Sequence, residues 1–282
     1  MVELRAGELI CRIEPRLGGC VTQLVLGGEP VLRPAPVPLE TARQSGSYPL
    51  VPFSNRIGGA TLQWQGTLHP LVRNNGTEPH AIHGIGWQRA WQVLDSEPSY
   101  ALLSFEHAAD ASWPFAFDAS QTIRVTPKAA EFTLALTNQS GRDAPAGLGW
   151  HPFFVKRPGA QLAVKTAGRW EMGDDKLPTR RVANGGIAGD IAALDVDHCF
   201  DGWDGVAHLR DALFDIRVRS NLTRIVVFTT PARDHIAIEP VSHVNNALAL
   251  AQGGDPAALG LVTLGPGETL SAQMTIEVER RA

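Results

Sequence analysis

The residues best suited to chemistry in this sequence are a glutamate and a histidine that each precede a proline. Glu239 follows an apolar run, residues 236–238, and His151 lies in GLGWHPFF, residues 147–154. Carboxylates are rarely buried beside such a run unless they are paired or used. Because proline holds the preceding residue extended, both side chains should have fixed positions. A carboxylate and an imidazole suit a general base and a general acid. The alternatives are a structural salt bridge for Glu239 and a place in the core for His151.

An arginine and a second histidine also interrupt apolar stretches. Arg56 follows Asn55 in YPLVPFSNRIGG, and its planar fork of donors suits paired oxygens. His83 precedes Gly84 in HAIHGIGWQRAW, and glycine lets a ligand or another backbone approach closely. The alternatives are a surface arginine leading into a turn and a histidine whose hydrogen bonds the backbone satisfies.

Asp197 lies in an acidic stretch, DVDHCFDGW, residues 195–203. Two further aspartates and a histidine in this stretch could suggest a metal site. The same density of Asp, Gly and His is also typical of an ordinary turn. We therefore predict no metal and no cofactor, and the sequence contains no nucleotide-binding glycine motif.

These residues are positioned by segments whose hydrophobicity has a period of two, which predicts half-buried antiparallel strands. The segments are residues 60–68, 100–107, 117–125, 130–138, 223–230 and 269–280. Short helical pieces are predicted only at 190–197 and 246–252. A strand at 236–238 is expected to end on Glu239. The proline-rich residues 32–49 read as a long loop or a linker, but the 31 residues before them would be a poor domain. The chain is thus predicted to be all-β, a large antiparallel β-sandwich forming one domain over residues 1–282.

The bulk composition argues against several classes of partner. The net charge is −4 and basic residues are scattered, so neither nucleic acid nor an anionic membrane is an expected partner. No apolar run approaches the length of a membrane span. The three cysteines contain no C-x-x-C motif and suggest neither a disulfide framework nor a thiolate metal site. A cytoplasmic protein is expected, and its oligomeric state stays open.

Taken in order, the interrupting stretches resemble the aldose 1-epimerase (galactose mutarotase) family. The matching pieces are PFSNRI, HAIHGIGW, GLGWHPFF, DHCF and AIEPVSHVNNAL, which extend from about residue 48 to 247. The residues within these motifs are most similar to those of the shorter bacterial branch. The resemblance implies a β-supersandwich whose concave face binds a pyranose and interconverts its α- and β-anomers.

The resemblance also implies roles for individual residues. His151 corresponds to the family's general acid and Glu239 to its general base. The positions matching the NRI, HG and DHxF motifs imply substrate contacts, and with one aromatic residue they make up the expected binding set: Asn55, Arg56, His83, Trp87 and Asp197.

The preferred sugar depends on a position near the HG motif. A sister branch that acts on hexose 6-phosphates has an arginine four residues after the HG histidine, where this chain has Trp87. An indole cannot replace a guanidinium as a phosphate clamp, so a neutral free aldose is predicted. Arg89 or Arg73 could still supply the clamp of a hexose-6-phosphate 1-epimerase.

Three further classes of protein stay open at this stage. One is a carbohydrate-binding β-sandwich without turnover. Another is a glycoside hydrolase that uses Glu239 and Asp197 as its two carboxylates. The third is a metal-dependent enzyme with His83, His151 and Glu239 as ligands.

Overall fold

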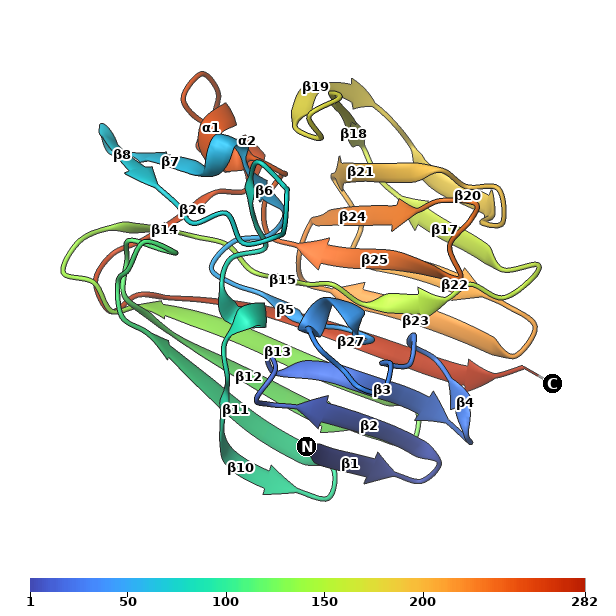
Figure 1. Ribbon diagram of the computed structural model, residues 1–282. Coiled ribbons are helices and arrows are strands. Elements are labelled where there is room, and N and C mark those ends of the chain that lie inside the picture. Colours follow the sequence, from blue (N-terminus) through green and yellow to red (C-terminus); the bar gives the residue numbers. More distant parts are fainter. Residues whose placement is uncertain (282) are drawn as a thin grey trace.

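The computed structural model describes residues 1–281 and confirms the predicted all-β class. Two large antiparallel sheets and a smaller one make up most of the fold (Figure 1). The other strands of residues 1–281 all form short two-stranded pairs. Cys11, Cys20 and Cys199 are free and buried.

The nine-stranded sheet supplies one wall of the core. Its strands, in spatial order, are β10 (Gln92–Glu97), β11 (Tyr100–His107), β12 (Phe117–Val125), β13 (Ala129–Asn138), β27 (Thr269–Arg280), β23 (Phe214–Ser220), β22 (Val206–Arg210), β17 (Gln161–Lys165) and β20 (Gly186–Asp190). Four of the predicted strands, at 100–107, 117–125, 130–138 and 269–280, lie here. In β27 buried and more exposed residues alternate, as its period of two requires.

The eight-stranded sheet carries the acid–base candidates. Its strands, in order, are β19 (Pro178–Ala183), β18 (Gly168–Met172), β21 (Val196–Asp201), β24 (Arg224–Thr229), β25 (His235–Val241), β15 (Gly149–Trp150) and β5 (Pro49–Leu50), with β16 (Phe153–Val155) also paired to β25. Every residue of β25 is buried. The expectation that this strand ends on Glu239 was wrong: it continues to Val241, and Pro240 lies within it.

The remaining elements are short. The four-stranded sheet contains β1 (Val2–Ala6), β2 (Leu9–Glu14), β3 (Cys20–Leu26) and β4 (Glu29–Pro30). The paired strands are β6 (Arg56–Ile57) with β9 (Ala81–Ile82), β7 (Thr61–Trp64) with β8 (Thr67–Pro70), and β14 (Ala144–Ala146) with β26 (Val262–Leu264). The helices are α1 (Ala247–Leu250) and α2 (Pro256–Leu259), with 3-10 turns η1 (Ala42–Gln44), η2 (Gly58–Ala60) and η3 (Gly86–Gln88).

Two local predictions were wrong, for reasons of turn chemistry. Residues 60–68 are not one strand: the hairpin β7–β8 turns at Gln65 and Gly66, which both have positive φ. Residues 190–197 form no helix but connect β20 to β21. Within 246–252 the predicted helix is present as α1. Residues 32–49 form the predicted long loop, apart from η1 and the start of β5.

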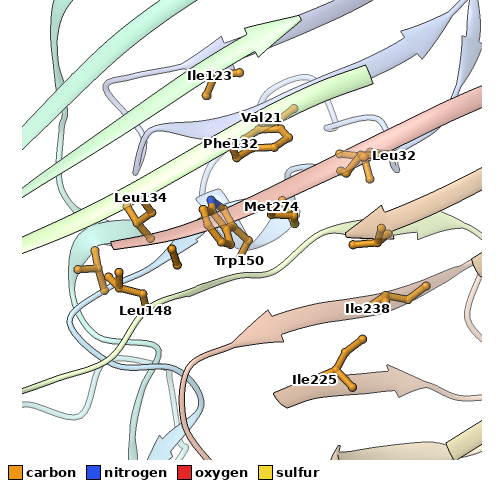
Figure 2. Packing of buried hydrophobic residues seen from close by; sticks show 14 of the residues in the cluster. Val21, Leu32, Ile123, Phe132, Leu134, Leu148, Trp150, Ile225, Ile238 and Met274 are labelled. Atoms are coloured by element: carbon orange, nitrogen blue, oxygen red, sulfur yellow. The ribbon is translucent and has the colours of Figure 1, made fainter. Parts of the chain in front are cut away.

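Apolar side chains from both large sheets meet in one buried cluster. Figure 2 shows Trp150, Phe132, Met274 and Ile238 within it. Because side chains alternate along a strand, Ile238 enters this core and the next residue, Glu239, faces the opposite side. On that side a second, smaller cluster includes Tyr48 and Phe153.

Candidate active site

A cavity of about 350 Å³ lies against the eight-stranded sheet. Its volume falls within the range of about 300–1,000 Å³ that small-molecule sites occupy. Six residues predicted from the sequence line it: Asn55, Arg56, His83, His151, Asp197 and Glu239. The structure therefore brings together side chains that are as far as 184 positions apart in the chain, from Asn55 to Glu239.

Strand pairing places the two acid–base candidates next to each other. β15 and β16 both pair with β25, and His151 is one of the two residues between them. Phe153 lies opposite Ala237, and Gly149 opposite Val241, so His151 faces the stretch of β25 that contains Glu239. The His151 Nε2 atom lies 3.2 Å from Glu239 Oε1.

Neither member of this pair has its polar atoms fully satisfied. Glu239 is 2% exposed and His151 is 7% exposed. Among the described residues, nothing hydrogen-bonds Glu239 Oε2 or His151 Nδ1. Buried polar atoms normally have partners, so these two atoms mark unmet hydrogen-bonding capacity in residues that line the cavity.

The surroundings shift both pKa values in the direction of the uncharged forms. Burial raises the pKa of Glu239 well above its usual value, and the Asp197 carboxylate adds to this effect while Arg56 opposes it. Burial also lowers the pKa of His151 well below its usual value, and the positive charges of Arg43 and Arg33 lower it further. Together the shifts favour a pair that is neutral overall and shares one proton.

Aromatic rings hold the His151 imidazole in place. It stacks on Tyr48 with ring centroids 4.9 Å apart and packs against Phe153 at 4.4 Å. The backbone N–H of His151 donates to the Tyr48 carbonyl at 3.0 Å. The His83 ring meets His151 edge-on at 5.2 Å. A ring held on several sides keeps its orientation as it gives or takes a proton.

Two hydrogen bonds connect His83 and Asn55, one between their backbones and one to the His83 ring. His83 N–H donates to the Asn55 carbonyl at 2.8 Å, and Asn55 N–H donates to His83 Nδ1 at 3.0 Å. Both residues have positive φ. Burial lowers the pKa of His83 well below its usual value, and the nearby His151 lowers this pKa further. With Nδ1 accepting, the neutral ring carries its proton on Nε2 and can donate a hydrogen bond there.

Gly84 explains why this loop needs a glycine after His83. A Cβ atom on Gly84 would lie 2.1 Å from the Val51 carbonyl oxygen, and its φ is +66°. The sequence left open whether a ligand or another backbone segment approaches Gly84, and in the structure it is the backbone at Val51.

Arg56 and Asp197 occupy other parts of the cavity wall. The Arg56 Nε atom donates to Glu78 Oε1 at 3.0 Å, which fixes the guanidinium. Asp197 lies on β21, two strands from β25, and is half-buried. Its charge is close enough to raise the pKa of Glu239.

Trp87 does not line the cavity, unlike the other predicted residues. It is 5% exposed and lies behind Tyr48, with ring centroids 6.1 Å apart. Its indole Nε1 donates to the carbonyls of Ile82 and Gly84 at 3.3 and 3.2 Å. In this position it supports the loop that carries His83.

Sequence reasoning missed ten residues of the cavity wall: Arg33, Arg43, Tyr48, Asn75, Glu78, Ile82, Phe153, Lys176, Phe228 and Arg233. Three of them share a signal already used for the acid–base candidates. Arg33, Tyr48 and Glu78 each precede a proline, as His151 and Glu239 do. The restriction that proline places on the preceding residue could have pointed to these three.

Within residues 1–281, no group of three or more His, Cys, Asp or Glu side chains could hold a metal ion. No helix in the same range is long and apolar enough to cross a membrane.

The two large antiparallel sheets define a β-sandwich that carries a polar cavity on one sheet. The sequence model of the family described as "Aldose 1-epimerase" matches residues 1–277, so the chain belongs to the aldose 1-epimerase family. It is 27% identical over 281 residues to the uncharacterized protein YphB of Escherichia coli K12, covering 93% of each chain.

Solved structures show the same fold. A candidate aldose 1-epimerase from Escherichia coli K12 is 25% identical, with a TM-score of 0.89 and coverage of 99% of both chains. A galactose mutarotase-like protein from Clostridium acetobutylicum is 20% identical, with a TM-score of 0.85 and coverage of 99% of this chain and 95% of the other. The β-supersandwich expected from the sequence is therefore confirmed.

Proposed function

We propose that this protein is an aldose 1-epimerase that interconverts the α- and β-anomers of an aldopyranose by opening and reclosing the ring. The observation that carries the proposal is the His151–Glu239 pair, with 3.2 Å between Nε2 and Oε1 in the wall of a monosaccharide-sized cavity. Membership of the family supports the same reaction.

The chemistry needs one group that accepts a proton and another that donates one. Glu239 takes the proton from the C1 hydroxyl while His151 delivers a proton to the ring oxygen O5. The C1–O5 bond breaks and C1 becomes an aldehyde. Rotation about C1–C2 presents the other face of the aldehyde, and the two proton transfers then run backwards to close the ring.

The pKa shifts suit this exchange. At ring opening the pair changes from a carboxylate with an imidazolium to a carboxylic acid with a neutral imidazole, so its total charge does not change. Burial favours the second form, because it stabilises the neutral state of both groups. Proton transfer through a coupled pair therefore costs less than creating an isolated buried charge.

The other wall residues have supporting roles in this proposal. The neutral His83 ring, the Arg56 guanidinium and the Asp197 carboxylate offer a donor, a fork of donors and an acceptor to sugar hydroxyls. Asn55 accepts from the Arg56 guanidinium at 3.4 Å and helps to orient it. We also propose a cytoplasmic location, which the three free, buried cysteines support.

Polarimetry tests the proposal against its alternatives. Freshly dissolved α-D-glucose and α-D-galactose should approach their equilibrium rotation faster in proportion to added protein, with and without a chelator. Sugar binding without acceleration would indicate a binding protein, and loss of rate with chelator would indicate a metal enzyme. Release of reducing sugar from glycosides would instead assign Glu239 and Asp197 to hydrolysis.

A further inference from the structure

The cavity wall carries more positive charge than its carboxylates balance. Five cationic side chains line it, Arg33, Arg43, Arg56, Lys176 and Arg233, against three carboxylates. The Arg56 guanidinium is paired with Glu78. Among residues 1–281 the other four cations form no ion pair with a carboxylate.

Two of these cations share one neutral acceptor. His235 Nδ1 lies 2.6 Å from Asp234 Oδ1 and so donates to it, which leaves Nε2 as an acceptor. Arg33 and Arg233 both donate to this Nε2, at 3.2 and 3.3 Å. Two guanidinium groups are thus held against one imidazole, although like charges repel each other. The one carboxylate beside Arg33, Arg233 and His235 is that of Asp234, whose side chain is 89% exposed and hydrogen-bonded to His235.

Both guanidinium groups are also fixed by aromatic rings. Arg33 lies over the Phe153 ring, 3.9 Å from its centroid, and Arg233 lies over Phe228 at 4.5 Å. Arg33 further donates to the carbonyls of Arg43 and Ser45 at 2.8 Å each. Guanidinium groups that are stacked and positioned before a ligand arrives lose little entropy when they bind an anion.

These cations lie on the side of the cavity where His151 lies. Phe153 contacts both the His151 ring, at 4.4 Å, and the Arg33 guanidinium. Arg43 and Arg33 are the charges that most strongly influence His151. Glu239 is instead influenced by Asp197 and Arg56.

The covalent structure of a pyranose connects this charge to the reaction. In the proposed mechanism His151 donates a proton to O5, and Glu239 accepts the proton of the O1 hydroxyl. C5 bonds both O5 and C6, so a substituent on C6 lies near O5 and away from O1. A sugar oriented by the acid–base pair therefore directs its C6 group toward the His151 side of the cavity.

We propose that the preferred substrate is an aldopyranose with an anionic group on C6, bound through Arg33 and Arg233 with Arg43 beside them. This inference rests on the proposed epimerase function, because the orientation of the sugar comes from the mechanism. A carboxylate and a phosphate ester share the required chemistry. The prediction of a neutral aldose rested on Trp87, whereas these cations come from two other segments, the loop 32–49 and the turn before β25.

The first test compares mutarotation of acidic and neutral sugars. Fresh α-anomers of D-glucuronate, D-galacturonate and glucose 6-phosphate are measured beside D-glucose and D-galactose at low ionic strength. At least one acidic sugar should exceed its neutral parent by about tenfold or more in kcat/KM. The two uronates and the phosphate ester distinguish the two kinds of anion. Added salt should reduce the preference, because these charges are partly exposed.

The second test removes one charge and compares it with a matched control. Arg233→Gln should lower the ratio of acidic to neutral kcat/KM by about fivefold or more, since one charge-assisted contact is lost. Arg124→Gln is the control, because Arg124 is also stacked on an aromatic ring, 5.0 Å from the Tyr100 centroid, but lies on β12 in the other large sheet. Its ratio should equal that of the wild type.

Calorimetric binding of the same sugars to the wild-type protein separates this inference from the proposed function. Mutarotation of neutral sugars at rates equal to or above those of the acidic ones would overturn the inference and leave the epimerase intact. Tighter binding of an acidic sugar without turnover of any sugar would support the anion site and overturn the epimerase. Absence of both binding and turnover would overturn both.

Discussion

Glu239 and Asp211 are both carboxylates buried in the same protein, at 2% and 1% exposure, yet their surroundings differ completely. Asp211 accepts hydrogen bonds from the backbone N–H groups of Leu213 and Phe214 at 2.7 and 2.8 Å, and it pairs with Arg157 at 2.9 Å. Within residues 1–281, the only ion-pair contact of Glu239 is with His151, and its second oxygen has no hydrogen-bond partner.

The difference separates a structural carboxylate from one that can do chemistry. Fixed donors stabilise the charge of Asp211, and its side chain is fully buried, so it cannot reach a ligand. Glu239 lacks such donors, so burial raises its pKa, and the residue lines the cavity with one oxygen unsatisfied. The comparison predicts that replacing each carboxylate by its amide will have opposite consequences for activity and for stability.

The largest effect is expected for Glu239→Gln on activity. The amide fills the same space but cannot accept the C1 hydroxyl proton, so kcat should fall by about 10²–10⁴-fold. The free energy of unfolding should not decrease, because an unsatisfied buried acid is removed. Polarimetry and urea denaturation measure the two quantities. A variant that keeps more than about half of the wild-type rate would exclude Glu239 as the general base.

Asp211→Asn should show the reverse behaviour. The amide leaves the largely buried Arg157 side chain without its charged partner, so the free energy of unfolding should fall by about 3 kcal/mol. The activity per folded molecule should remain near that of the wild type, since Asp211 is not in the cavity wall. Urea denaturation curves and rates corrected for the folded fraction provide the check. An Asp211→Asn protein as stable as the wild type would remove the contrast with Glu239.

Acid should destabilise the fold through a histidine that is buried in its neutral form. His243 accepts from the Ser54 N–H at Nε2 and donates from Nδ1 to the Val244 carbonyl, and burial lowers its pKa from 6.5 to about 4. Because the pKa of His243 is lower in the folded than in the unfolded protein, neutral His243 contributes fully to stability above pH 6.5. This contribution is lost as the pH falls from 6.5 toward 4. In His243→Gln the slope of unfolding free energy against pH should decrease by about 1.4 kcal/mol per pH unit in this window.

Denaturation at a series of pH values measures that slope. The variant loses some stability at pH 7, because its hydrogen bonds are imperfectly replaced, so the slope is the decisive quantity. Equal slopes for the variant and the wild type would show that His243 does not titrate on unfolding.

The smallest effect is expected for Trp87→Phe. The Ile82 and Gly84 carbonyls lose the indole donor but keep the Asn74 side-chain donor, so stability should fall by about 1 kcal/mol. KM should change by less than about threefold, because the structure places Trp87 behind Tyr48 rather than in the cavity wall. A much larger rise in KM, with kcat retained, would restore the role as a substrate contact that the sequence suggested.

The sequence predicted the regular part of this molecule well, because the period of two in segments such as 269–280 directly reflects a sheet with one buried face. It failed where turn geometry overrides the pattern, as at Gln65 and Gly66. It also could not predict how far β25 continues past Glu239, because proline usually ends a strand and here lies within one.

Within the cavity wall, the residues that the sequence singled out are those that stand out from apolar surroundings. His151 and Glu239 are polar residues in buried segments, and the structure brings them into contact. Arg233 and Lys176 could not be predicted, because they are exposed cations in loops and resemble any solvated side chain. Only the packing of distant segments shows that they face the same cavity.

The central claim is that Glu239 and His151 act as one unit, and a double-mutant cycle tests it most directly. Mutarotation is measured for Glu239→Gln, His151→Asn and the variant with both changes. If the two groups exchange protons with the sugar as a pair, the double variant should be slower than the worse single variant by less than about threefold. Losses that multiply, so that the double variant combines the full effects of both single changes, would show independent roles and contradict the account.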